Sequence, residues 1–272
     1  MRPIKTSLTP EEEKKTYAKY FYQPLATPNP ELITILEKGP MNPSKALMPE
    51  NIAHLAEDGY DEVETGYCVC PNGTGYLAVN NIFPGATIEM LQWWFAWHCL
   101  EDMRYMLWYN KCHFGTFISD ADRAKILDPN VPLAEKSHGI THHIIEDIGG
   151  GPDNIDISFL SPKDLGFDPA IVAQKHLALI GGNGTSQSRA GGPKIPTLML
   201  HLYREIPSGV ESRTRFWMGY QIKNGKICNM LPEGIRIPLE APMGLAFHNV
   251  CEFSNLANIL PSLYKEMNGH IG

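Results

Sequence analysis

The chain of 272 residues lacks the features that mark several broad classes of protein. No apolar run approaches the ~18 residues that a membrane-spanning helix needs, and residues 1–15 are polar and charged, without the apolar segment of a secretory signal. Basic residues are not in excess: the formal net charge is −7, and no basic stripe of the kind that binds nucleic acid is present. We therefore expect a soluble, cytoplasmic protein with neither nucleic-acid nor membrane partners.

Paired cysteines and nucleotide-binding motifs are also missing. The 6 cysteines form no Cys-x-x-Cys pair, and several lie in apolar stretches where a free thiol packs as a small hydrophobe, so disulfides are not expected. Two glycine-rich stretches, residues 149–152 and 181–184, contain neither a G-x-G-x-x-G motif nor the lysine of a P-loop. We interpret both as connecting loops, the second bordering the mouth of a cavity.

The sequence does contain enough apolar material for one large core. Hydrophobic residues make up 43% of the chain and aromatic residues 10%. A capping box that starts at Thr9 predicts a helix through Tyr20. We expect residues 1–60 to form a helical arm whose tyrosines face a partner chain, and residues 61–272 to form the main domain.

The order of the expected elements favours an α+β fold. Alternation and turn signals predict antiparallel strands in four stretches, namely a hairpin over 67–79 and strands over 139–148, 197–205 and 213–222. An aromatic-rich helix is expected over residues 88–100, and a long C-terminal helix begins at Pro242. This order suits a curved antiparallel sheet wrapped around the C-terminal helix, a helix-grip architecture that encloses a cavity.

His248 and Glu252 lie on the stripe of the C-terminal helix that also carries apolar residues, so both should enter the core. Burial of an unpaired charge is costly unless a hydrogen-bonded partner, a shifted pKa or a metal compensates it. The four-residue spacing brings the two side chains within ~6 Å of each other, which suits a shared metal ion. A His–Glu hydrogen bond that only satisfies two core polar groups is the alternative.

Two further polar residues stand where burial needs a reason. His113 ends a segment just before a Phe-Gly turn, and Glu146 shares one face of an expected strand with isoleucines. With His248 and Glu252 they make two histidines and two glutamates, a set that suits zinc and also iron or manganese.

Ordered motifs give the chain a resemblance to a known family. They are Trp93-Trp-Phe-Ala-Trp-His, Arg104-Tyr-Met-Leu-Trp followed by His113, His143-Ile-Ile-Glu-Asp-Ile-Gly, and Phe247-His-Asn-Val-Cys-Glu. In these motifs the sequence resembles the phloretin hydrolase and 2,4-diacetylphloroglucinol hydrolase family, from about residue 60 to residue 265. The resemblance implies a helix-grip domain of the birch-pollen-allergen type, preceded by a small N-terminal region that helps to form a homodimer.

The resemblance also implies a site and a reaction. The zinc ligands of the family match four positions here, which are His113, Glu146, His248 and Glu252, with Asp147 as an alternative to its neighbour Glu146. Three polar cavity residues of the family match Tyr105, His201 and Tyr220. We expect His201 to transfer a proton and the two tyrosines to hold phenolic oxygens, with the tryptophan cluster and Phe247 as apolar walls. The implied reaction is hydrolysis of the carbon–carbon bond between a phloroglucinol ring and its acyl carbonyl.

Two other functions are compatible with the sequence. One is a non-catalytic helix-grip protein that binds a hydrophobic ligand and uses the His and Glu residues as a metal-free polar network. The other is a metal-dependent enzyme of another substrate class, with the same ligands and a changed pocket. The sequence also leaves the acyl group open between a short acetyl and a long arylpropanoyl chain.

Overall fold

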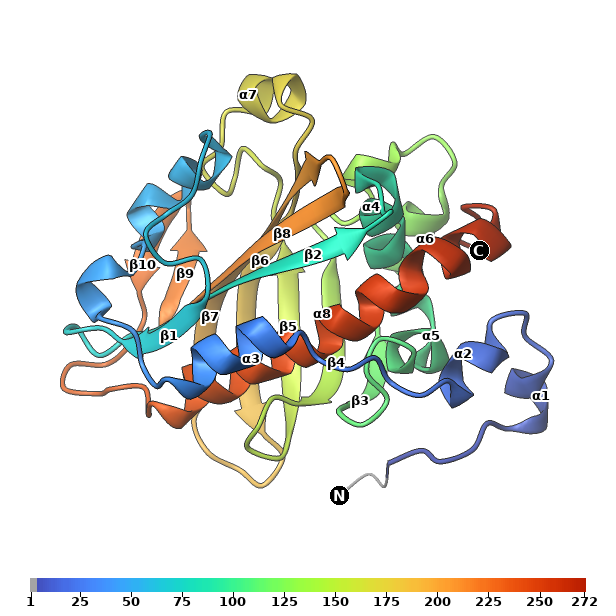
Figure 1. The fold of residues 1–272 in the computed structure, drawn as a ribbon, viewed down its shortest axis with the longest axis horizontal. Helices are drawn as coiled ribbons and strands as arrows, with labels where there is room; N and C mark the ends of the chain where they lie inside the picture. The colour runs from blue at the N-terminus through green and yellow to red at the C-terminus, as the bar shows by residue number, and fades with distance from the viewer. Residues whose placement is uncertain (1–3) are drawn as a thin grey trace.

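A computed structural model describes residues 4–272 and has an α+β fold. One 8-stranded sheet, antiparallel throughout, packs against a C-terminal helix of 28 residues, α8 (Glu240–Met267). Helix α8 crosses one face of the sheet diagonally, and α3 (Pro30–Glu37) lies alongside it (Figure 1). The predicted antiparallel sheet and long C-terminal helix are therefore confirmed.

The strands occur in the sheet in an order that places the hairpin at one edge. In that order they are β1 (Gly66–Val69), β2 (Gly75–Pro84), β8 (Gly209–Met218), β7 (Ile195–Ile206), β6 (Ala178–Ser188), β5 (Pro152–Phe159), β4 (Thr141–Asp147) and β3 (His113–Phe117). A separate two-stranded sheet pairs β9 (Tyr220–Lys223) with β10 (Lys226–Asn229). Strands β5 and β6 were not predicted from the sequence.

The interpretation of residues 181–184 as a loop is wrong, because they lie inside strand β6. A Cβ atom on Gly182 would approach the carbonyl oxygen of Ser158 on β5 to 2.1 Å, so only glycine fits there. The glycines that suggested a loop instead allow close contact between neighbouring strands of a curved sheet. Residues 149–151 do form the connection between β4 and β5.

The remaining helices surround one end of the sheet and its outer face. They are α1 (Pro10–Glu13), α2 (Ala18–Tyr22), η1 (Pro43–Lys45), η2 (Pro49–Ala56), α4 (Ile88–Trp97), η3 (His98–Leu100), α5 (Asp102–Met106), α6 (Asp120–Leu127), η4 (Leu133–Glu135) and α7 (Pro169–Gln174). The capping box at Thr9 is present, but α1 ends at Glu13 instead of continuing through Tyr20. Packing of the following tyrosines against the core overrides the local helix preference.

Tyr17 and Tyr20 of the N-terminal arm are buried against their own chain. The ring of Tyr17 lies 4.9 Å from that of Trp97, edge to face, and the Tyr20 hydroxyl donates a hydrogen bond to Glu266 of α8. The expectation that these tyrosines face a partner chain is therefore wrong. The division at residue 60 and the homodimer stay predictions.

Alternation along the central strands gives the sheet two different buried faces. On β7, Met199 and His201 point to the side covered by α8, whereas Leu198, Leu200 and Leu202 join the apolar cluster on the opposite side. That opposite face is covered by η2 and by the segment around Phe167. The face toward α8 is only partly filled by side chains, which leaves room for a cavity.

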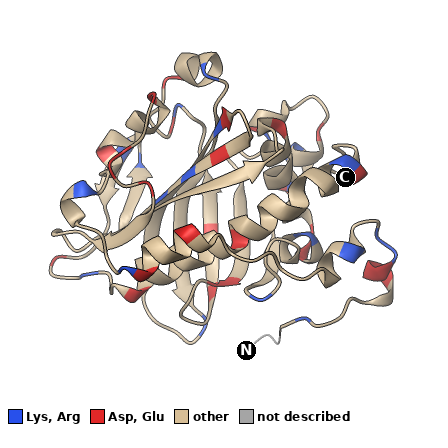
Figure 2. Cartoon of the chain, viewed as in Figure 1, with Lys and Arg blue, Asp and Glu red and all other residues tan. Residues whose placement is uncertain are grey.

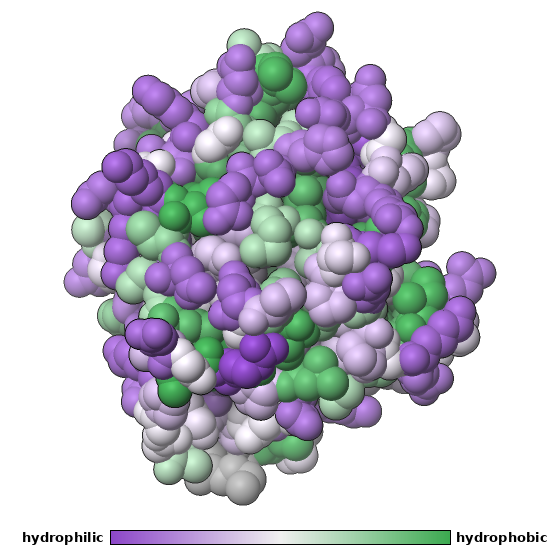
Figure 3. Space-filling model, turned by 90° about the vertical axis from the view of Figure 1, so that its left-hand side faces the viewer, coloured by the Kyte–Doolittle hydropathy of each residue, from purple (hydrophilic) through white to green (hydrophobic). Residues whose placement is uncertain are grey.

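The surface carries charges of both signs. Basic and acidic residues are interspersed over the ribbon without a continuous basic stripe in the view of Figure 2. The face shown in Figure 3 is mostly hydrophilic, with small separate apolar patches. Among the described residues, no helix combines the length and the apolar character needed to cross a membrane.

Candidate metal centre and cavity

Strand register brings the first two candidate ligands side by side. His113 opens β3 and pairs directly with Glu146 on β4, and a bulge follows between His113 and Gly115. Along β4, the residues His142, Ile144 and Glu146 share the buried face, as alternation predicts. A histidine and a glutamate from segments about 30 residues apart therefore meet as cross-strand neighbours on the inner face of the sheet.

Helix α8 supplies the other two candidate ligands. His248 and Glu252 lie one turn apart on the helix face that packs toward the sheet, and both are buried. Their helix contacts β1 and β2 along its length, which fixes its rotation about its own axis. The structure thus brings together all four residues that the sequence singled out.

The ligand atoms of these residues, which we call the His/Glu cluster (His113, Glu146, His248 and Glu252), lie within 4.8 Å of one another. His248 Nε2 is 2.8 Å from Glu146 Oε1 and 3.6 Å from Glu252 Oε2. His113 Nε2 is 3.4 Å from both Glu252 Oε2 and His248 Nε2. Four atoms bound tetrahedrally at ~2.0–2.2 Å from one ion would be ~3.3–3.6 Å apart, so the cluster has roughly the dimensions of a zinc-type site.

The charges of the cluster also fit a cation. Burial by itself raises the pKa of each glutamate, but the neighbouring imidazoles outweigh it and hold the pKa of Glu146 and of Glu252 below the ordinary value. Burial lowers the pKa of His248, yet the two carboxylates raise it well above its usual range. Without a metal, protonated His248 supplies positive charge between the two ionised carboxylates; a divalent ion would displace that proton and supply the charge instead.

Hydrogen bonds from neighbouring residues orient the candidate ligands. The Tyr105 hydroxyl donates to Glu146, and its ring stacks on that of His113 with centroids 4.3 Å apart and planes 4° from parallel. His113 Nδ1 lies 3.3 Å from the carbonyl oxygen of Tyr105, so donation there leaves Nε2 free to face the cluster. Asn249 donates to Glu252 (3.2 Å) and accepts from Asn81 (3.0 Å).

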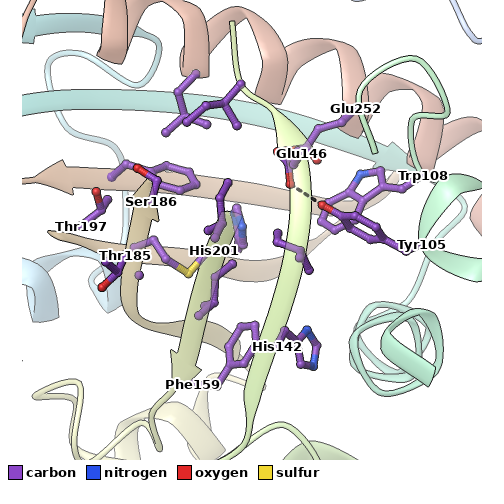
Figure 4. A pocket seen from close by; sticks show the side chains of 18 of the residues that line it. Tyr105, Trp108, His142, Glu146, Phe159, Thr185, Ser186, Thr197, His201 and Glu252 are labelled. Atoms are coloured by element: carbon purple, nitrogen blue, oxygen red, sulfur yellow. Dashed lines mark hydrogen bonds between the residues drawn. The ribbon is translucent and has the colours of Figure 1, made fainter. Parts of the chain in front are cut away.

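A cavity of about 90 Å³ adjoins the cluster between the sheet and α8. Both Glu146 and Glu252 line it, so the candidate metal site and the cavity share a wall (Figure 4). The rest of the lining is mostly apolar, with polar exceptions at Tyr105, His98, His142, Thr185, Ser186, Thr197 and His201. Such a space, apolar with a few polar groups, is typical of a site for a small organic ligand.

His201 lies where the sequence placed it, in the cavity wall on β7. It is buried, and its Nδ1 is 2.8 Å from the Thr214 hydroxyl of the neighbouring strand. Burial lowers the pKa of His201 to about 4, although the nearby Glu252 carboxylate opposes this shift. The imidazole is therefore uncharged near neutral pH, a state in which it can accept a proton.

Tyr220 does not belong to the site. Gly219 precedes it with φ of 103°, which ends the regular alternation of β8 after Met218, a cavity residue. Tyr220 consequently packs in the apolar cluster on the other face of the sheet, where its hydroxyl accepts a hydrogen bond of 2.9 Å from Asn72. Within the sequence, only Gly219 itself indicates this change of face.

The positions of Asp147 and of the expected apolar wall residues differ from those of the candidate site. Asp147 points away from the cluster, and its carboxylate accepts backbone hydrogen bonds from Gly149 and Gly151 in the β4–β5 turn. Within the described residues the candidate strand ligand is Glu146. The tryptophans of α4 and Phe247 do not line the cavity, whose aromatic wall comes from Phe95, Trp108, Phe159 and Phe216 instead.

His98 and His142 also line the cavity and were not singled out in the sequence. Alternation does place His142 on the same face of β4 as Glu146, but nothing in the sequence marked it as a site residue. His98 follows the aromatic helix and had no comparable signal.

The fold and the site define a class of protein: an α+β fold in which a sheet and one long helix enclose a cavity beside a buried His/Glu cluster that could hold a metal ion. A family model described as "DAPG hydrolase PhiG domain" matches residues 47–265. The chain is 37% identical over 267 residues to a phloretin hydrolase of Eubacterium ramulus, covering 97% of this chain and 94% of that protein. It is 30% identical over 264 residues to a 2,4-diacetylphloroglucinol hydrolase of Pseudomonas protegens, covering 93% and 84% of the two chains.

The chain therefore belongs to the 2,4-diacetylphloroglucinol hydrolase family, and it is an enzyme of the hydrolase class.

Proposed function

We propose that the enzyme is a metal-dependent hydrolase that cleaves the carbon–carbon bond between a phloroglucinol ring and its acyl carbonyl. The observation that carries this proposal is the His/Glu cluster, because its carboxylates border a mostly apolar cavity that has a few polar groups. The names of the relatives supply the substrate class, since they are hydrolases of phloretin and of diacetylphloroglucinol. The architecture corresponds to the helix-grip type.

The four members of the His/Glu cluster would hold the metal, which we take to be zinc, with iron or manganese as alternatives. A divalent ion there supplies Lewis acidity, polarising an oxygen of the substrate and lowering the pKa of water. Tyr105 is a positioning residue in this scheme, because its hydroxyl is engaged with Glu146. This replaces the expectation that Tyr105 holds a phenolic oxygen.

The chemical difficulty is the leaving group, because expulsion of an aryl carbanion is prohibitively unfavourable. A phloroglucinol ring avoids it by tautomerisation: a hydroxyl proton leaves oxygen and a proton is added to the ring carbon that bears the acyl group. Water then adds to the ketone carbonyl, the carbon–carbon bond breaks, and its electron pair returns to the ring as an enolate. The products are a phloroglucinol and a carboxylic acid.

His201 is our candidate for the proton transfers of the ring. Its uncharged imidazole accepts a proton from a ring hydroxyl, and the resulting imidazolium is acidic enough to protonate carbon. The low pKa of His201, about 4, favours this second transfer and disfavours the first by the same amount. General acid–base catalysis of this kind contributes ~10²–10⁴-fold to a rate.

The length of the acyl chain is not decided by the enclosed volume. The cavity of about 90 Å³ is smaller than the ~150 Å³ of an engineered cavity that holds one benzene molecule. An acylphloroglucinol must therefore displace side chains or extend past the enclosed space. We propose phloretin as the first substrate to test, on the higher identity to phloretin hydrolase.

Metal content and turnover test the proposal together. We expect about one zinc per chain in the purified protein, and loss of both zinc and phloretin cleavage in His248→Ala. His143→Ala is the matched control, since His143 lies on β4 but is exposed and pairs with Asp156. Metal without turnover of acylphloroglucinols would indicate another substrate class. A protein that binds no added metal would favour the ligand-binding alternative.

Oligomeric state is a separate part of the proposal. We propose a homodimer on the resemblance to the family, and light scattering of the purified protein tests it. A monomeric mass at micromolar concentration would refute the proposed homodimer.

A further inference from the structure

His98 and His142 are buried histidines of the cavity wall that neither the His/Glu cluster nor the proton transfers use. Their exposed fractions are 2% each, and their ring centroids are 5.4 Å apart with planes at 80°. Burial lowers the pKa of His98 to about 4 and that of His142 well below its usual range. Both imidazoles are therefore uncharged near neutral pH, and each carries one donor and one acceptor nitrogen.

Among the described residues, this pair makes one hydrogen bond, through His98, and one of its nitrogens is buried without a partner. His98 Nδ1 lies 2.7 Å from the carbonyl oxygen of Trp94, so it donates there and leaves Nε2 as an acceptor. His142 Nε2 is buried and has no hydrogen-bond partner among the described residues. A buried polar atom without a partner destabilises the protein, and a ligand that bonds to it recovers that cost on binding.

The histidine pair and the His/Glu cluster lie at different ends of the cavity. His142, Ile144 and Glu146 follow one another on the inner face of β4, and all three line the cavity. A separation of four residues along a strand corresponds to ~13 Å between Cα atoms. Figure 4 shows Glu146 and His142 toward opposite ends of the same strand. The cavity therefore runs from the carboxylates to the histidine pair.

We propose that His98 and His142 form a second hydrogen-bonding site that binds the phenolic hydroxyl para to the acyl group of the substrate. This inference rests on the proposed function for the identity of the ligand. A phenolic hydroxyl both donates and accepts one hydrogen bond, which matches the free acceptor of His98 and the unpaired nitrogen of His142. With the acyl carbonyl near the cluster, the para position is the part of the ring that points farthest along β4.

The site makes the enzyme selective for rings with a para hydroxyl. We would measure dissociation constants of 2,4,6-trihydroxyacetophenone and 2,6-dihydroxyacetophenone by quenching of tryptophan fluorescence in the metal-loaded protein, since Trp108 lines the cavity. The native chain should bind the trihydroxy compound about tenfold more tightly, and His142→Phe should bind the two compounds equally.

Matched variants separate this role from a structural one. His143→Phe makes the same change at the adjacent position, on the exposed face of β4, and should keep the tenfold preference. His142→Gln retains a hydrogen-bond donor and acceptor in its amide and should keep part of the preference for the trihydroxy compound. This variant also tests the site if His142→Phe folds poorly. Zinc content should be unchanged in all three variants.

The two hypotheses fail in different ways. Equal binding of the two acetophenones by the native chain, or a full preference in a folded His142→Phe, would overturn the second site. A preference that depends on His142, in a protein that cleaves no acylphloroglucinol, would uphold the second site and overturn the proposed function.

Discussion

The hydroxyl of Tyr105 provides a direct test of how the candidate metal centre is built. Replacement of Tyr105 by phenylalanine removes the donor to Glu146 and retains the ring that stacks on His113. Outer hydrogen bonds of this kind change metal affinity by ~10–100-fold. At ~1.4 kcal/mol per tenfold, the expected loss is about 1.4–2.8 kcal/mol of zinc binding free energy. The range agrees with the ~1.5–3 kcal/mol of a hydrogen bond to a charged group.

The assay is competition for zinc against a chromophoric chelator at neutral pH, on native protein and on Tyr105→Phe. Tyr109→Phe is the control, because its ring lies 5.9 Å from that of His248 while its hydroxyl lies beside Cys251. We expect a weaker affinity in Tyr105→Phe and little change in Tyr109→Phe. Equal zinc affinity in native protein and Tyr105→Phe, with only the KM for substrate raised, would refute the positioning role and return Tyr105 to substrate binding.

Three further predictions concern stability and the ligand shell. Asn249→Ala should lower zinc affinity about tenfold by freeing the Glu252 carboxylate, measured by the same competition; an unchanged affinity would contradict it. Gly182→Ala should lower the midpoint of thermal unfolding sharply while Gly150→Ala, whose added Cβ meets nothing within 4 Å, should not; similar midpoints would be evidence against the close strand contact. The pKa of His201 is about 4 in the folded chain against ~6.5 when unfolded, so the unfolded state binds the extra proton and stability falls as pH drops from ~6.5 to 4. We would measure the free energy of unfolding in urea, with a metal chelator present. For each pH unit that the pH falls across that window, His201→Phe should gain about 1 kcal/mol of stability relative to native protein. Equal pH dependence of the two unfolding free energies would exclude the shift of the His201 pKa.

The helix and strand that carry most of the site could be predicted from the sequence because their apolar residues recur at a regular spacing. The apolar stripe of α8 indicated that His248 and Glu252 face the core, and alternation on β4 did the same for Glu146. The spacing of residues along each segment could not predict that these segments meet at one point. It depends on the pairing of His113 with Glu146 and on the packing of α8 across the sheet.

The errors arose where tertiary contacts override local signals. Strand β6 contains the glycines of residues 181–184, whose usual meaning is a loop, yet the curved sheet needs them for close strand contact. Tyr220 was assigned to the cavity by the resemblance to the family, but Gly219 interrupts the alternation of β8 and Tyr220 packs on the other face of the sheet. The tyrosines of the arm pack on α4 and α8 of their own chain, a contact that composition does not reveal.

The central claim is hydrolysis of a carbon–carbon bond, and the most direct test is product analysis in ¹⁸O-labelled water. Zinc-loaded protein should convert phloretin to equal amounts of phloroglucinol and an arylpropanoic acid, with label from the solvent in the acid alone. A chelator should abolish the conversion and added zinc should restore it. Intact phloretin after incubation with zinc-loaded, folded protein, or products whose acid carries no label, would contradict the account.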